Sequence, residues 1–233
     1  MVNNINIEIR HSGNLIGNAS YLILNKVKRK YSLKFFDIEL TDSIEINSEI
    51  NISVYIKDYL MGFSSKILKK INLDDLWTEF EVQCYFDELH EFNQFYLDIF
   101  RLWNTGYTVE WNTLNSVNER ESFLRCCAIW TGVASHINLK NEYVIDGKLI
   151  NHPIDLYCVL GQVFFGDKGY FGTEINSFVD CLSQLELEEN NSVIKIFHYN
   201  ELDERLSNFR GYKGYLQTII EEFEISSFTI IKL

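Results

Sequence analysis

The chain of 233 residues is 46% hydrophobic and 15% aromatic with one proline and 12 glycines, which excludes a disordered, collagen-like or proline-rich protein and suffices for two packed domains. Its 21 basic and 33 acidic residues give a formal net charge of −12, which repels a phosphate backbone, so we expect no direct binding of nucleic acid. An acidic protein suits a basic protein partner, because complementary charge speeds encounter.

Residues 5–56 show a period-two alternation of apolar and polar residues, as in Ile5-Asn6-Ile7-Glu8-Ile9. This period is typical of strands with one solvated face. We expect antiparallel strands near residues 4–10, 20–26, 31–40 and 44–56. The basic run Lys26–Lys30 then lies at a hairpin tip, where a solvated turn is favoured over a contact with phosphate or membrane.

The segment from Asn72 to Trp103 predicts a long helix with one break, because Asn72 is placed to cap it and two aspartates lie in its first turn. We expect a short strand at residues 107–111 and a second helix from residue 116 or 118 to 130. The antiparallel strands followed by these helices define an α+β domain over residues 1–138.

From residue 141 onward, predicted strands alternate with predicted helices. The strands are expected at residues 143–145, 193–198 and 228–231, and the helices at residues 153–165, 173–185, 200–207 and 212–223. Strands separated by helices indicate a parallel sheet. We therefore expect residues 141–233 to form an α/β domain in which helices pack a three-stranded parallel sheet. This segment holds 15 acidic and 7 basic residues, a net charge of −8.

The cysteines have no CxxC spacing, and no histidines stand near them in a metal-ligand pattern. They are Cys84, Cys126, Cys127, Cys158 and Cys181. We expect no metal site and no cofactor, and thiols that are mostly buried as small hydrophobes. The N-terminus lacks a basic flank before an apolar core, and no apolar stretch approaches about 20 residues. We expect no membrane partner and a cytoplasmic protein.

Motifs of common enzyme classes are missing from the sequence, which has no GxxxxGK[ST], no GxGxxG after a strand and no HExxH. His90 lies among Asp87, Glu88 and Glu91, but neighbouring acids point around a helix rather than to one face. A solvated helix surface is favoured over a metal site there. We expect a protein that is not an enzyme.

The C-terminal domain carries several motifs in a fixed order. Val144–Lys148 (VIDGK) reads as a strand ending in a turn, Asp155–Leu160 (DLYCVL) lies in the first helix, and Phe228–Ile231 (FTII) closes the sheet. The most specific motif is Tyr170–Leu182 (YFGTEINSFVDCL). In this order, and over about 90 of the 233 residues, the chain resembles the barstar family of intracellular ribonuclease inhibitors.

The resemblance implies that the second helix of this domain and the loop before it form an acidic surface that plugs the active site of a ribonuclease. Tyr170, Gly172, Ile175 and Asp180 match contact positions of the family. Asp180 is the leading contact, because a carboxylate there can accept paired hydrogen bonds from an arginine in a phosphate-binding cleft.

Three positions depart from the family pattern. Glu174 stands where the family has asparagine, Asn176 where it has an acid, and Val179 where it has an aromatic residue. The acidic contact would then pass to Glu174, which argues against cross-inhibition of the familiar barstar target. A later acid of the family corresponds to Glu221 or to Glu222.

The same helix also has a purely structural interpretation. Ile175, Phe178, Val179 and Leu182 are apolar at helical spacing, while polar residues such as Asp180 fall on the other side. This is the pattern of an amphipathic surface helix, with Thr173 as its cap.

From the resemblance we expect a bacterial immunity protein that binds a cognate basic ribonuclease toxin stoichiometrically and occludes its active site. The alternative is an interaction module with the same fold that binds another basic protein. The N-terminal domain would enlarge the interface, hold the C-terminal domain in register, bind a second partner, or itself be the inhibitor.

Overall fold

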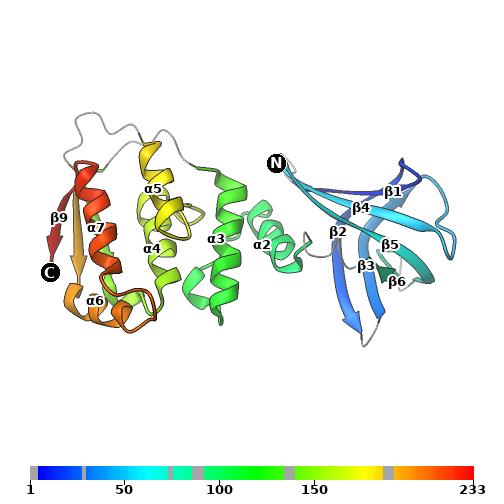
Figure 1. Ribbon diagram of the computed structural model, residues 1–233. Coiled ribbons are helices and arrows are strands. Elements are labelled where there is room, and N and C mark those ends of the chain that lie inside the picture. The colour runs from blue at the N-terminus through cyan, green and yellow to red at the C-terminus, as the bar shows by residue number, and fades with distance from the viewer. Residues whose placement is uncertain (1–4, 28–29, 73–75, 86–91, 134–139, 186–191) are drawn as a thin grey trace. The chain divides into compact units, whose positions relative to one another are not determined.

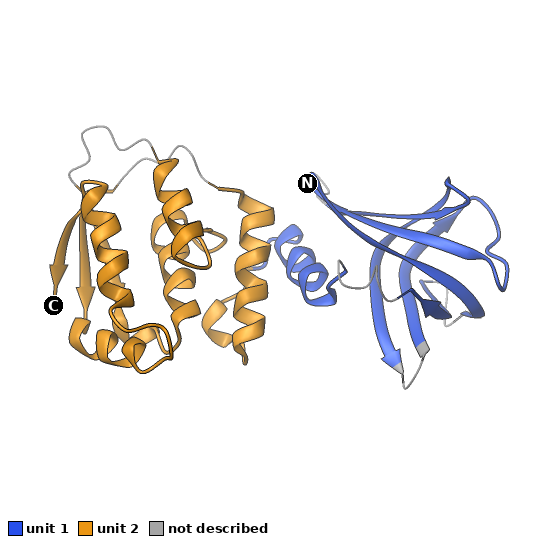
Figure 2. Ribbon diagram, viewed as in Figure 1, with its two compact units in different colours: residues 1–107 blue, residues 108–233 orange. Residues whose placement is uncertain are grey.

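The computed structural model describes residues 5–27, 30–72, 76–85, 92–133, 140–185 and 192–233. The chain forms two compact units, residues 1–107 and residues 108–233 (Figure 2). The sequence analysis put the division at residues 138–141, so helix α3 (Val117–Thr131), which it assigned to the first domain, belongs to the second unit. None of the helices in the described part of the chain is long and apolar enough to span a membrane.

The first unit contains a closed six-stranded antiparallel barrel with the strand order β1-β2-β3-β6-β5-β4. Its strands are β1 (Ile5–His11), β2 (Asn14–Val27), β3 (Lys30–Leu40), β4 (Glu49–Ile56), β5 (Tyr59–Asn72) and β6 (Trp77–Cys84) (Figure 1). β1 pairs with β4 as well as with β2, and this pairing closes the sheet. The expected antiparallel strands are confirmed, and β5 and β6 join them.

Alternation along the strands sends every second side chain into the barrel. In β1, Ile5, Ile7 and Ile9 are buried and the residues between them are not. In β6, Phe80 and Val82 are fully buried in the same way. Removing these apolar side chains from water is the main force that holds the barrel together.

The helix predicted over residues 72–103 is wrong at residues 77–84, which form a strand, and is confirmed at residues 94–103. Strand β6 occupies part of that range, and helix α2 runs only from Gln94 to Asn104. Phe80, Val82 and Cys84 alternate, so a strand buries all three on one face and a helix would not. The aspartates at 74 and 75 and the acidic cluster around His90 lie outside the described residues.

The strand predicted at residues 107–111 is also wrong. Residues 107–110 have no regular structure, and Trp111–Thr113 form a 3-10 turn. Tyr107 is 67% exposed, so its aromatic ring lies outside any core, whereas Trp111 is buried and its indole N–H donates to Gln162 Oε1 at 3.0 Å. A β-forming composition without a partner strand does not produce a strand.

Helix α2 packs against β2 through one side-chain amide. Gln94 Oε1 accepts from the backbone N–H of Leu24 at 3.0 Å, and Gln94 Nε2 donates to the carbonyl of Leu22 at 3.2 Å. Asp98, one turn later, accepts from the Tyr21 hydroxyl and, at 2.9 Å, from Gln94 Nε2. The Gln94 amide thus makes the hydrogen bonds that a neighbouring strand would otherwise make to Leu22 and Leu24, because buried backbone N–H and C=O groups need partners.

The second unit contains a three-stranded parallel sheet with the order β7-β8-β9, packed by helices (Figure 1). The strands are β7 (Glu142–Asp146), β8 (Val193–Phe197) and β9 (Thr229–Lys232). The helices after α3 are α4 (Pro153–Phe165), α5 (Ile175–Ser183), α6 (Tyr199–Ser207) and α7 (Tyr215–Ile225). The expected α/β architecture with a parallel sheet is confirmed in this general form.

An aromatic cluster forms much of the core of the second unit. The ring of Phe164 in α4 lies 4.1 Å from Tyr143, 4.8 Å from Phe171, 5.6 Å from Phe223 and 5.9 Å from Phe228, measured between centroids. These rings belong to β7, the loop before α5, helix α7 and the residue just before β9. The cluster therefore fixes the position of α5 relative to the sheet.

A buried ion pair joins α3 to α4. Arg120 Nε lies 2.7 Å from Asp155 Oδ1, and Asp155 Oδ2 accepts from the backbone N–H groups of Asn151 and His152, both at 2.9 Å. Asp155 is only 3% exposed, and a buried carboxylate needs such partners. All five cysteines are unbridged and buried, which confirms the expectation of buried thiols.

Candidate functional site

The loop before α5 is shaped by Gly172, which is buried and has a φ of +90°. A Cβ at this position would lie 2.6 Å from the backbone nitrogen of Phe178. Only glycine fits both the backbone conformation and this close approach. Gly172 therefore contributes to the expected contact surface by its backbone, which sets the path of the loop.

Ser177 fixes the junction between this loop and α5. Its hydroxyl oxygen accepts from the backbone N–H of Thr173 at 2.8 Å and of Glu174 at 3.1 Å, and the hydroxyl donates to the Glu174 carbonyl at 3.0 Å. The helix begins at Ile175 with Glu174 as its N-cap residue, one position later than the Thr173 cap considered from the sequence. The Ser177 hydroxyl is therefore engaged in hydrogen bonds at the start of its own helix.

The outer side of α5 presents two adjacent rows of side chains. Asn176 and Asp180, one turn apart, are exposed, and Ile175 and Val179, also one turn apart, are half-buried beside them. The opposite side buries Phe178, Cys181 and Leu182. We call Glu174, Ile175, Asn176, Val179 and Asp180 the α5 face. The structure brings together five of the eight residues predicted for the site on this face.

Tyr170 lies in the loop before α5, and its side chain is half-buried. Burial raises the pKa of its hydroxyl.

Glu221 is on a different side of the unit. It is exposed on α7 and accepts from Gln217 Nε2 at 3.1 Å, and Gln217 accepts from Lys232 Nζ of β9 at 3.0 Å. This flank of α7 therefore faces β9. Glu222 follows Tyr215 by seven residues, two turns of helix, so it shares the flank of Tyr215 that faces α4. The correspondence of either acid to the family position stays a prediction.

A group of tyrosines where α7 meets α4 was missed by the sequence analysis. The hydroxyls of Tyr157 in α4 and Tyr215 in α7 are hydrogen-bonded, and the ring centroids of Tyr212 and Tyr215 lie 4.6 Å apart. Burial raises the pKa of the Tyr157 and Tyr215 hydroxyls. We call Tyr157, Tyr212 and Tyr215 the tyrosine patch. The spacing Tyr212-Lys213-Gly214-Tyr215 before a helix was the available signal.

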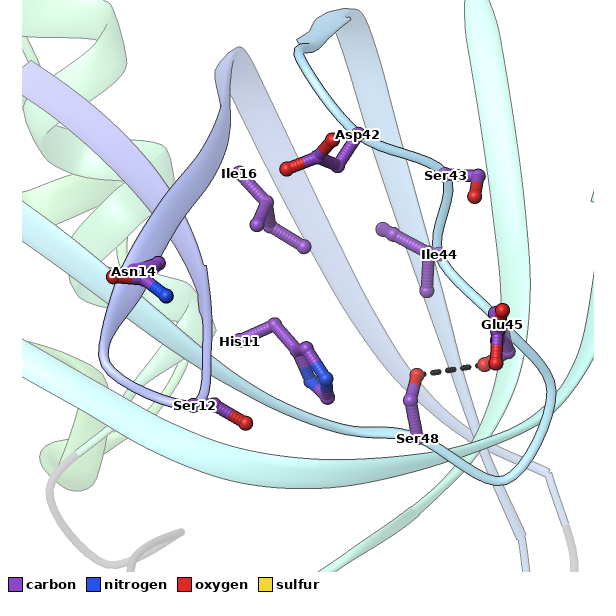
Figure 3. Close-up of a pocket in the computed structure, with 9 residues that line it drawn as sticks. All are labelled: His11, Ser12, Asn14, Ile16, Asp42, Ser43, Ile44, Glu45 and Ser48. Carbon is purple, nitrogen blue, oxygen red and sulfur yellow. Dashed lines mark hydrogen bonds between the residues drawn. The ribbon is translucent and has the colours of Figure 1, made fainter.

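A separate concave feature lies in the first unit, between the β1–β2 turn and the segment that joins β3 to β4 (Figure 3). It has a volume of about 380 Å³ and is lined mainly by polar residues. His11 Nδ1 lies 2.7 Å from the carbonyl of Glu49, so Nδ1 carries the proton and Nε2 is an acceptor in the neutral ring. Asp42 and Glu45 add carboxylates to the lining. None of these residues was predicted from the sequence to form a site.

Two buried thiols of the second unit have raised pKa values. The thiols of Cys127 and Cys181 are buried, which raises their pKa to about 12 and about 11 and keeps them protonated near neutral pH. Within the described ranges, no three His, Cys, Asp or Glu side chains converge as a metal site would require. The α5 face instead combines apolar and acidic groups at a helix surface, as interfaces do.

Comparisons with protein-family models, with curated proteins and with solved structures found no match to this chain. We therefore argue its function from its own residues.

Proposed function

We propose that this chain is an immunity protein that binds a ribonuclease toxin stoichiometrically and occludes its active site with the α5 face and the loop before it. It acts in the cytoplasm by binding alone, without chemistry of its own. The resemblance of Tyr170–Leu182 and the flanking motifs to the barstar family motivates the proposal, and the parallel sheet packed by helices is compatible with it.

The single observation that carries the proposal is the composition of the α5 face. Asp180 and Asn176 are exposed next to the half-buried Ile175 and Val179. An apolar row beside a carboxylate gives a surface that is desolvated on binding and also has a charged contact. The Ser177 hydrogen bonds and Gly172 hold the start of this helix in place before binding, so little order is lost when a partner docks.

Charge supports a basic partner. Residues 141–233 hold 15 acidic and 7 basic residues, so the field around the second unit attracts cationic proteins. A ribonuclease binds the RNA phosphates with basic groups, and the Asp180 carboxylate would accept hydrogen bonds in the place of a phosphate.

The test is capture of partners on the tagged full-length chain from a lysate of its own organism, followed by a ribonuclease assay on a fluorogenic RNA. We expect a basic ribonuclease that is silenced at an equimolar ratio. Asp180→Ala should weaken inhibition about tenfold or more, as loss of a charged interface contact does. Glu224→Ala removes the same charge from an exposed position on α7 and should leave inhibition unchanged.

Two outcomes would overturn the proposal. A captured basic protein without nuclease activity would favour the interaction module instead. A ribonuclease inhibited equally well by the wild type and by Asp180→Ala would show that the interface lies away from the α5 face.

A further inference from the structure

We propose that the pocket of the first unit binds a small linear diamine, a molecule with two ammonium groups joined by a short carbon chain. The pocket lies between the β1–β2 turn and the segment that joins β3 to β4, and its volume is about 380 Å³. Small-molecule sites have volumes of about 300–1,000 Å³, so the pocket is large enough for such a ligand. The inference concerns the barrel and goes beyond the proposed function, which uses the second unit.

Backbone hydrogen bonds fix the walls of the pocket. At one end of the joining segment, the Thr41 N–H donates to the Ile16 carbonyl at 2.9 Å. At the other end, the Ile67 N–H donates to the Ser48 carbonyl at 3.0 Å. The Ser48 hydroxyl also donates to the Glu45 carbonyl at 2.6 Å, which closes the segment on itself (Figure 3). Because the walls are already ordered, little conformational freedom is lost when a ligand enters.

Two isoleucines give the pocket an apolar surface for a carbon chain. Ile16 and Ile44 line it, and their side chains are only 5% and 8% exposed. In Figure 3 they lie between Asp42 and His11, so an apolar stretch separates two polar positions. A ligand with a carbon chain between two polar ends matches this order, and its chain is removed from water where it contacts the isoleucines.

The polar groups on the two sides of this apolar surface accept hydrogen bonds. Asp42 and Glu45 line the pocket, and an ionised carboxylate only accepts. His11 Nδ1 lies 2.7 Å from the Glu49 carbonyl, so in the neutral ring Nδ1 donates there and Nε2 accepts. No lysine or arginine is among the described residues that line the pocket.

An ammonium group is the ligand chemistry that fits these acceptors. It carries a positive charge and donates up to three hydrogen bonds, and its bonds to carboxylates are charge-assisted. One ammonium would donate to the Asp42 carboxylate and the other to His11 Nε2, with the carbon chain over Ile16 and Ile44. We therefore infer that a diamine binds more tightly than a monoamine or a neutral diol of the same length.

The test is a titration of the full-length chain with 1,4-diaminobutane, followed by backbone amide NMR. The shifts should saturate and be largest in residues 11–16 and 42–48. Butylamine, which has one ammonium, should bind about tenfold more weakly, the effect of one charge-assisted hydrogen bond. The neutral 1,4-butanediol should cause no saturable shifts.

Two matched variants separate the pocket from the general acidity of the chain. Asp42→Asn removes one charge from the lining and should weaken the diamine about tenfold. Asp58→Asn removes the same charge from an exposed position in the β4–β5 turn, at the far end of β4 from the pocket, and should leave binding unchanged.

Three outcomes would overturn the inference. Shifts that spread over the chain without saturating, or equal weakening in both variants, would show only the attraction of a cation to an acidic protein. Butanediol that binds as well as the diamine would show that charge does not select the ligand. Absence of diamine binding would also overturn it, and any of these results would leave ribonuclease inhibition by the second unit to be judged on its own test.

Discussion

The two units build their cores in different ways. In the first unit every second residue of six strands points inward, and the pairing of β1 with β4 closes the ladder of hydrogen bonds into a ring. In the second unit a cluster of aromatic rings around Phe164 ties helices to a three-stranded sheet. The barrel spreads its stability over many aliphatic contacts, whereas the second unit depends on a few large rings.

The units also differ in what they leave at the surface. Residues 108–233 hold 18 acidic and 10 basic residues, a net charge of −8, against 15 and 11, a net charge of −4, in residues 1–107. The second unit further presents an ordered helix, α5, with apolar and acidic rows side by side. The comparison indicates that the surface suited to a basic partner belongs to the second unit, and each of the following predictions tests one side of it.

The largest effect is expected for Phe164→Ala. Removing a ring that contacts Tyr143, Phe171, Phe223 and Phe228 leaves a cavity and should cost about 3–5 kcal/mol. The measurement is amide hydrogen exchange, resolved by peptide, in increasing urea. Exchange should accelerate in residues 108–233 and stay unchanged in β1 to β6, because the rings that Phe164 contacts lie in the second unit.

Phe80→Ala in β6 is the reciprocal change. Phe80 is fully buried in the barrel, and the centroid of its ring lies 6.0 Å from that of Phe35. Its loss should accelerate exchange in the first unit alone. If either variant destabilises both units equally, the division into two independent cores is wrong.

Alkaline pH should destabilise the second unit more than the first. Burial raises the pKa of Cys126, Cys127, Cys158 and Cys181 in the second unit, and of Cys84 alone in the first. Above a pH of about 8.5 the unfolded chain releases these thiol protons and the folded chain keeps them, so the free energy of unfolding falls as pH rises toward the folded pKa.

At a pH of about 9.5 each buried thiol should lower the free energy of unfolding by about 1 kcal/mol. With four such thiols in the second unit and one in the first, the second unit should lose about 3 kcal/mol more of its stability. Urea unfolding followed by hydrogen exchange at pH 7.5 and pH 9.5 measures the difference. Cys181→Ala, at the thiol whose pKa is about 11, should reduce the pH dependence of the second unit. Equal losses in both units would contradict the expected asymmetry.

A smaller effect is expected for Gly172→Ala. An alanine at this position would hold an unfavourable φ of +90°, and its Cβ would lie 2.6 Å from the Phe178 nitrogen. Together these should lower the free energy of unfolding by about 2 kcal/mol. Gly214→Ala is the matched control, since Gly214 has a φ of +72° and open space around its Cβ position, so that change should cost about 1 kcal/mol. Thermal unfolding of the second unit measures both, and equal costs would show that the close approach at Gly172 has no consequence.

Much of the second unit was predictable from local sequence. The helix expected at residues 153–165 has the same bounds in the structure, with Pro153 in its first turn and Asp155 accepting from the His152 N–H. The strand expected at residues 193–198 ends one residue earlier. These elements carry their own start and stop signals, so the chain specifies them locally.

The first unit was predicted less well for a physical reason. Leu73-Asp74-Asp75-Leu76 and the glutamates that follow favour a helix locally, whereas the alternation of Phe80, Val82 and Cys84 favours a strand. Pairing of β6 with β3 and β5 decides between the two. Strand propensity depends on partners, so a strand whose neighbours are far along the chain is the hardest element to assign.

The candidate site likewise has a part that the sequence predicts and a part that it does not. The α5 face could be predicted, because Glu174 to Asp180 lie within one helix and its periodicity fixes which residues share a side. The tyrosine patch could not, since it depends on how α4 and α7 pack together.

The sequence by itself determined the parallel α/β unit, its acidic charge and the residues of the α5 face, because local periodicity and capping specify those elements. Only the tertiary structure decided the closure of the barrel, the boundary that places α3 in the second unit, and the meeting of Tyr157 in α4 with Tyr215 in α7. Each of these depends on contacts between residues distant in the chain, which packing and backbone pairing select and local propensity does not.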